Sequence, residues 1–117
     1  MYGNVNGGGN VKPLQTVEQK LWDGASITYY ILPEMKLVIG YLFIGTGIIQ
    51  ANTWYSYAFP SEVGVPAADR EAPLADSANG ISSARAKVDK GTRRMNLYTG
   101  NLRTGAKPAG TLMFPIE

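Results

Sequence analysis

The chain has 117 residues, the size of one domain, and 44% of them are apolar, which is enough for a single hydrophobic core. It contains no histidine and no cysteine, which excludes disulfides, Ser-His-Asp and Cys-His catalytic arrangements, and zinc sites built on imidazole or thiolate. The formal net charge of +2 is too small for a strongly basic nucleic-acid-binding protein. We therefore expect no enzymatic activity, no cofactor, no bound metal and no nucleic-acid partner.

The N-terminal stretch MYGNVNGGGNVKP is rich in glycine and asparagine, and it predicts a flexible lead-in over residues 1–13. One folded domain is expected over residues 14–117. Its first two strands are predicted over residues 14–22 and 25–32, because the Asp-Gly pair between them is a strong turn signal.

The most apolar stretch, KLVIGYLFIGTGIIQ at residues 36–50, would be a membrane span, a buried helix or two strands. As a helix, residues 37–49 would rise only about 20 Å against a hydrocarbon core of about 30 Å, so no membrane insertion is expected. Its three glycines each weaken a helix by about 1 kcal/mol, whereas its β-branched and aromatic residues favour strands. Two strands are therefore predicted, joined at residues 45–47, and the second runs through IIQANTWYSYAF at residues 48–59.

The segment after this strand, residues 61–80, holds two prolines and many small residues with little periodicity. It predicts a long ordered loop with at most one short strand. The only helical candidate in the chain lies here, at residues 68–78, and Pro73 counts against it.

The last third of the chain returns to strands. Apolar and polar side chains alternate over residues 84–89 and again over 93–98, and the Lys-Gly pair at 90–91 allows a hairpin between them. A final strand is predicted over residues 111–116. Seven or eight short strands, glycine turns and no convincing helix predict an all-β domain, an antiparallel β-sandwich or jelly roll.

Four aromatic residues are candidates for contact with a saccharide or with a neighbouring subunit, because amphipathic rings suit both uses. Packing in the core is the alternative for each of them. Within the strand, Tyr55 and Tyr57 share one face and Trp54 lies on the other, so only one of these two faces can belong to the core. The candidates are Trp54, Tyr55, Tyr57 and Tyr98.

Basic residues are concentrated between residues 85 and 107, where Asp89 is the single acid. One interpretation is a solvated hairpin face, and another is a patch for a polyanion such as a teichoic acid or an acidic polysaccharide. The loop at residues 62–76 carries four acids against one arginine. A third interpretation is that the basic residues pair with the acids of this loop, within one chain or between subunits. The candidate residues are Arg85, Lys87, Arg93, Arg94 and Arg103.

The motif KLWDG at residues 20–24 resembles a Lys-Leu-Trp-Ser-Gly opening of tail and baseplate-type proteins from phages that infect Gram-positive bacteria. An apolar strand follows in both, and YAFPSEV at residues 57–63 is similar to an aromatic strand that ends in Phe-Val-Pro-Lys. Asp23 replaces the serine and Ser61 stands in place of the lysine, and the resemblance covers residues 20–63. It implies the β-sandwich head domain of a tail fibre or receptor-binding protein. Such a domain would form a homotrimer in the virion, contact other tail proteins and bind a host-surface saccharide.

Three functions on one fold are therefore open. The leading one is a non-enzymatic phage tail domain that binds a host cell-surface glycan. The second is a structural virion protein, a capsid decoration or tail-assembly subunit, in which the same aromatic and charged residues are buried between subunits. The third is a carbohydrate-binding module appended to an enzyme. Whether the tyrosines lie in an open cleft or in a protein interface would distinguish the first two.

Overall fold

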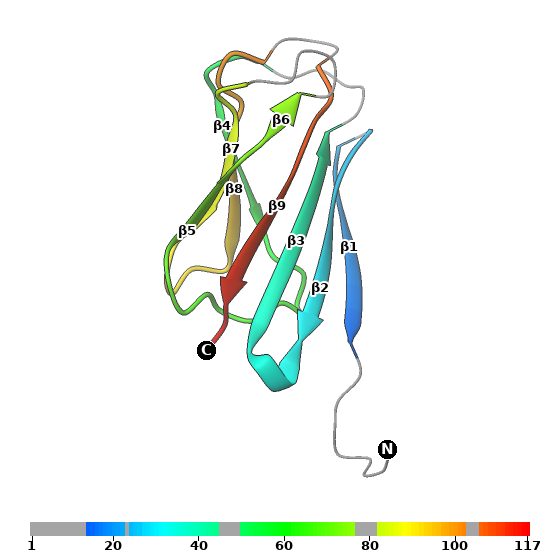
Figure 1. Cartoon of the computed structure of the whole chain (residues 1–117), viewed down its shortest axis with the longest axis vertical. Helices are drawn as coiled ribbons and strands as arrows, with labels where there is room; N and C mark the ends of the chain where they lie inside the picture. The colour runs from blue at the N-terminus through cyan, green and yellow to red at the C-terminus, as the bar shows by residue number, and fades with distance from the viewer. Residues whose placement is uncertain (1–13, 23, 45–49, 77–81, 103–105) are drawn as a thin grey trace.

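The chain folds into two antiparallel β-sheets that pack face to face (Figure 1). The computed structural model describes residues 14–22, 24–44, 50–76, 82–102 and 106–117. In chain order the elements are β1 (Gln15–Trp22), β2 (Ala25–Leu32), the 3-10 turn η1 (Pro33–Met35), β3 (Leu37–Ile44), β4 (Trp54–Ala58), β5 (Arg70–Pro73), β6 (Ala75–Asp76), β7 (Arg85–Val88), β8 (Arg94–Tyr98) and β9 (Pro108–Pro115). One sheet has the order β1-β2-β3-β9-β6 and the other the order β4-β8-β7-β5, so the predicted all-β sandwich is confirmed.

The first three strands form a meander, in which β2 pairs with both β1 and β3. A β-bulge interrupts β1 between Lys20 and Trp22, so that Trp22 pairs with Ala25 and faces the other sheet. The two strands predicted over residues 14–22 and 25–32 are confirmed. The lead-in and the turn at residues 45–47 lie outside the described residues. No helix in the described part of the chain is long and apolar enough to cross a membrane.

The strand predicted over residues 48–59 was wrong at its start, because β4 begins only at Trp54 and belongs to the other sheet from β3. A turn at residues 51–52 precedes it, where Asn52 has a left-handed backbone with φ of 54°. Asparagine adopts this conformation more readily than most residues. The Asn52 N–H donates to the Gly100 carbonyl at 2.7 Å, which fixes the place where the chain enters the second sheet.

The segment predicted as a loop with at most one short strand contains two, β5 and β6, and they lie in different sheets. The change of sheet occurs at Leu74, whose side chain is buried between them and whose N–H donates to the Ala84 carbonyl at 3.0 Å. Pro73 is tolerated because β5 is an edge strand, where a missing N–H costs no ladder bond. The last strand, β9, begins three residues earlier than predicted and ends at Pro115, as a proline there suggests.

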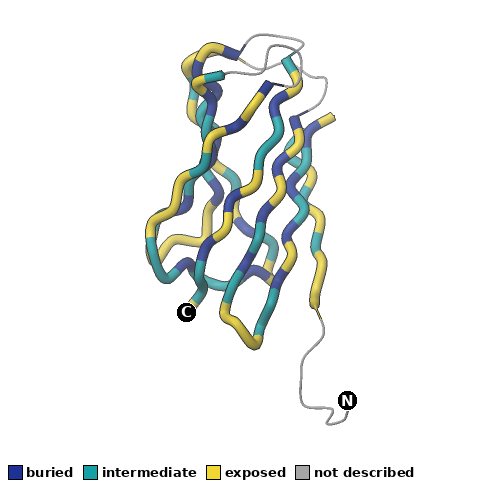
Figure 2. Tube along the Cα trace, viewed as in Figure 1, coloured by how far each residue is buried: buried dark blue, intermediate teal, exposed yellow. Residues whose placement is uncertain are grey.

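Buried and exposed residues alternate along most strands, as the bands of Figure 2 show. The alternation predicted for the β7–β8 hairpin is confirmed, since Ala86, Val88, Met95 and Leu97 are fully buried. The hairpin itself closes with Thr92 N–H donating to the Asp89 carbonyl at 3.1 Å. One face of the four-stranded sheet is therefore core, and the other is open to ligands.

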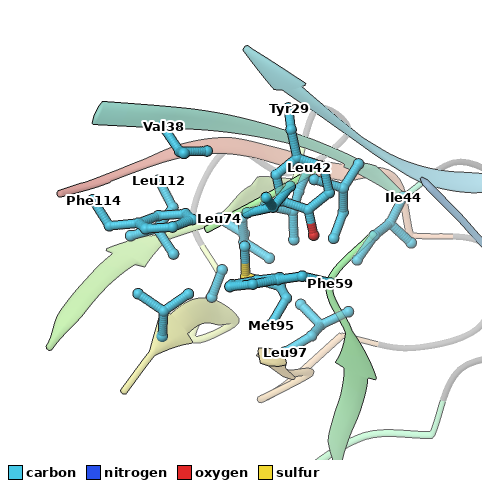
Figure 3. Close-up of a cluster of buried hydrophobic side chains, with 14 of the residues drawn as sticks. Tyr29, Val38, Leu42, Ile44, Phe59, Leu74, Met95, Leu97, Leu112 and Phe114 are labelled. Carbon is cyan, nitrogen blue, oxygen red and sulfur yellow. The ribbon is translucent and has the colours of Figure 1, made fainter. Parts of the chain in front are cut away.

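Aromatic rings fill the space between the sheets (Figure 3). Phe59 stacks on Phe114, with ring centroids 5.6 Å apart and planes 11° apart, and it meets Tyr29 edge-on at 5.8 Å. Figure 3 shows that both sheets contribute to this cluster, with Leu42 and Leu112 from the five-stranded sheet and Met95 and Leu97 from the four-stranded sheet. The inner face of the four-stranded sheet packs on this core, and the side chains of its outer face point away from it.

Candidate functional site

The outer face of the four-stranded sheet brings together aromatic and basic candidates from three strands. Trp54 on β4 and Arg85 on β7 are both opposite Tyr98 on β8, so these three side chains form one row across the sheet. A second row, two residues along, runs from Ser56 through Asn96 to Lys87. All of them point away from the core because side chains alternate between the faces of a strand. We call this surface the platform, and it consists of Trp54, Ser56, Arg85, Lys87, Arg94, Asn96 and Tyr98.

Trp54 lies on the edge strand of the platform, and 46% of its surface is exposed. Its ring lies 5.0 Å from that of Tyr98, with the two planes tilted by 37°. Arg85 Cζ is 5.5 Å from the Trp54 centroid and 4.9 Å from that of Tyr98, and Lys87 Nζ is 5.5 Å from Trp54. These distances are those of cation–π contacts. The Tyr98 hydroxyl donates to Asn52 Oδ1 at 3.3 Å, so both rings of the platform are held in place.

The two cations on β7 are paired with acids. Arg85 Nε lies 3.0 Å from Glu71 Oε2, and Lys87 Nζ lies 3.5 Å from Asp89 Oδ1. The Arg85 N–H is not aimed at that oxygen, so the contact is an ion pair without a hydrogen bond. All four side chains are substantially exposed, and each pair therefore stabilises the fold by at most about 1 kcal/mol. The ion pair between Glu71 and Arg85 joins the acidic segment at residues 62–76 to the basic hairpin within one chain. This is one of the three interpretations that the sequence left open.

The remaining basic candidates have different surroundings. Arg94 donates to Ser56 through Nε to the side-chain hydroxyl at 2.7 Å and through Nη2 to the carbonyl at 3.1 Å. It has no carboxylate partner among the described residues. Arg93 belongs to the loop after β4 instead, because its Nη2 donates to the carbonyls of Pro60 at 3.0 Å and Val63 at 2.7 Å. Arg103 lies outside the described residues.

Tyr55 and Tyr57 lie on the opposite face of β4 from Trp54, and both are half-buried. Their rings are 5.7 Å and 6.4 Å from that of Trp22, at the side of the sandwich where β1 approaches β4. Burial raises the pKa of the Tyr57 hydroxyl, and the neighbouring Tyr55 raises it further. Gln19 closes this side by donating from Nε2 to the Ala58 carbonyl at 2.6 Å. The tyrosines thus belong to the inner face of β4, and the tryptophan to its outer face.

Sequence reasoning did not single out Ser56, Asn96 or Glu71 as site residues. The first two could have been found from the two-residue period of a strand, because they follow Trp54 and precede Tyr98 by two positions. Glu71 was predicted only as one of the four acids at residues 62–76 that could pair with the basic residues, since its place beside Arg85 depends on the pairing of β5 with β7.

Two shallow hollows border the platform along β5. One has a volume of 240 Å³ and is lined by Asp69, Glu71 and Lys87 among others, and the second, of 270 Å³, is lined by Glu71, Ser83 and Arg85 among others. A chain-like ligand that covers Trp54 could therefore extend past the two cations into either hollow. A third hollow, of 330 Å³, lies beside Phe43 on the opposite sheet and takes no part in this site.

A scan against protein-family models and searches of curated proteins and of solved structures returned no match to this chain. Among the described residues, no group of three or more carboxylates, histidines or cysteines is placed to hold a metal ion. The chemistry that the platform offers is stacking on an exposed ring together with hydrogen-bond donation from guanidinium, ammonium and amide groups.

Proposed function

We propose that this domain is a non-enzymatic adhesin of a phage tail and that it binds a saccharide of the host cell surface on the platform. The observation that carries the proposal is Trp54, an exposed ring in contact with Tyr98 and with the cations of β7. A pyranose presents an apolar C–H face that packs on such a ring, and hydroxyls that accept hydrogen bonds. Asn96 lies in the next row of the platform, and Arg94 reaches Ser56 in that row, so a sugar that extends from the ring would meet both kinds of contact.

The charges favour a saccharide with little charge over a polyanion. Arg85 and Lys87 are matched by Glu71 and Asp89, which leaves Arg94 as the cation of the platform without a carboxylate partner in the described part of the chain. A nucleic acid or a teichoic acid presents many phosphates, and its affinity depends on several cations that replace counterions. We infer a neutral oligosaccharide, or one with an isolated carboxylate that Arg94 would bind.

The resemblance at residues 20–63 supports the assignment to a phage tail, and the all-β fold agrees with it. A specific observation also favours the second candidate, a structural virion protein. Tyr41, Phe43 and Met113 are exposed on the outer face of the five-stranded sheet, where a subunit contact would cover them. In that case the platform would be a second protein contact and would bind no saccharide.

A glycan array followed by titration tests the saccharide proposal. The purified domain is applied to neutral, N-acetylated and uronic-acid oligosaccharides, and the strongest binder is titrated by calorimetry. Trp54→Ala is expected to weaken binding at least tenfold, and Trp54→Phe, which keeps a ring, to weaken it less. Met35→Ala is the control, since this side chain is 65% exposed on η1, away from the platform, and its loss should leave the affinity unchanged. Thermal unfolding confirms that each variant is folded.

Two polyanions complete the experiment, a purified teichoic acid and a 20-nucleotide oligothymidine. The low charge of the platform predicts weak binding of both at physiological salt. Binding of either polyanion more tightly than any oligosaccharide, with a steep salt dependence, would contradict the proposed ligand class. The absence of any oligosaccharide binding, or binding that Trp54→Ala does not change, would overturn the proposed site.

A further inference from the structure

The outer face of the five-stranded sheet is apolar and exposed. Strands β2, β3 and β9 lie side by side in it (Figure 1) and contain no charged residue along their whole length. On this face Tyr30 is 37% exposed, Tyr41 41%, Phe43 43% and Met113 55%. Together with Ile39 they form a surface that we call the apolar face.

The register places these side chains next to one another. Tyr30, Ile39 and Met113 pair across three neighbouring strands and form one row. Tyr41 lies in the next row, between two threonines, and Phe43 in the row after that. The apolar face is therefore continuous over the middle of the sheet, on the opposite side of the sandwich from the platform.

The size of this surface can be compared with that of protein interfaces. Strands β2, β3 and β9 span about 14 Å at a spacing of about 4.8 Å, and residues 37–43 span about 24 Å at about 3.4 Å per residue. The footprint is thus about 340 Å² per copy, or about 680 Å² if two copies meet face to face. This is less than the roughly 1,000 Å² that a stable specific interface needs, so a weak, concentration-dependent contact is expected.

We propose that the apolar face is a self-association surface that packs against the same face of a second copy of this chain. A two-fold axis brings the same surface of both copies together. Because this face is uncharged, its apolar rows would meet apolar rows without repulsion between like charges. The neighbouring edge strand β1 has Glu18 and Lys20 at its outward positions, one charge of each sign, so the rim adds no net repulsion. The platform points outward in such a pair, which would present two saccharide sites per particle and raise avidity for a cell surface.

Molar mass in solution tests this inference. Sedimentation equilibrium of the full chain between about 5 and 500 µM should show the weight-average mass rising from 12.6 kDa towards twice that value. Tyr41→Lys places a charge at the centre of the apolar face and should weaken association at least tenfold. Tyr41→Thr keeps a strand-forming residue and removes the ring, so it tests the same contact if the lysine variant is unstable. The matched control is Ala58→Lys, which adds the same charge on the exposed side of β4 and should associate like the parent chain.

Three results would overturn the proposed self-association. A mass that stays at one chain over the whole range overturns the proposal, as does association that both Tyr41 variants leave intact. A limiting mass of three chains, which the phage resemblance predicts, would overturn the two-fold geometry.

Discussion

Two glycines with left-handed backbones give a matched test of what supports the platform. Gly91 in the β7–β8 turn has φ of 81°, and Gly100 just after β8 has φ of 55°. Alanine in this conformation costs about 1–2 kcal/mol at either position. The surroundings differ, because a Cβ at Gly91 would have no atom within 4 Å, whereas a Cβ at Gly100 would lie 2.6 Å from the carbonyl carbon of Ser83 and 2.7 Å from its oxygen.

The overlap at Gly100 includes the backbone of Ser83 as well as its Oγ atom, so the segment at Ser83 would have to move. That segment is held by Asn101, whose Oδ1 accepts from the Ser83 N–H at 2.9 Å and whose own N–H donates to Ser83 Oγ at 2.8 Å. Each of these hydrogen bonds contributes about 1 kcal/mol. Gly100→Ala should therefore lower the free energy of unfolding by about 3–4 kcal/mol, and Gly91→Ala by about 1–2 kcal/mol.

Urea unfolding followed by tryptophan fluorescence measures both free energies, and thermal unfolding checks them. For a domain of this size about 1 kcal/mol corresponds to about 4 °C, so Gly100→Ala should lose about 12–16 °C and Gly91→Ala about 4–8 °C. Equal losses in the two variants would show that the backbone conformation alone sets the cost. The steric account of Gly100 would then be refuted.

Two further predictions concern buried hydroxyl groups. The buried Thr99 Oγ1 accepts a hydrogen bond from the Thr53 N–H at 2.9 Å and donates one to the Gln50 carbonyl. Thr99→Val should therefore lower the free energy of unfolding by about 2 kcal/mol. Thr99→Ser keeps the hydroxyl and should retain most of that stability, and urea unfolding measures both variants. Burial raises the pKa of Tyr29, whose hydroxyl donates to Gln19 Oε1 at 2.8 Å, so the folded state stays protonated where the unfolded chain ionises. The stabilisation that Tyr29 contributes is complete below about pH 10 and should fall by up to about 1.4 kcal/mol per pH unit above it. Tyr29→Phe should reduce this fall in unfolding curves at pH 8, 10 and 11. An unchanged pH dependence in Tyr29→Phe would contradict this explanation.

Much of the fold could be predicted because its signals are local. The turn glycines and the two-residue alternation of residues 84–89 and 93–98 predict strands without reference to the rest of the chain, and the structure confirms them. The boundaries that failed are set by distant partners. The start of β4 depends on the hydrogen bond from Asn52 to Gly100, and the split between β5 and β6 depends on Leu74 entering the core.

The same division holds for the site. From the sequence alone, Trp54 and its tyrosine neighbours must lie on opposite faces of a strand, because side chains alternate there. Which face would be buried could not be predicted, since aromatic residues suit both a core and an exposed surface, and Trp22 on a strand of the other sheet decides it by packing on Tyr55. Composition also determined that no imidazole or thiolate chemistry is available. Only the tertiary structure placed Tyr98 and Arg85 against Trp54 and set Glu71 beside Arg85, because strand order and register are properties of the whole sheet and not of any one segment.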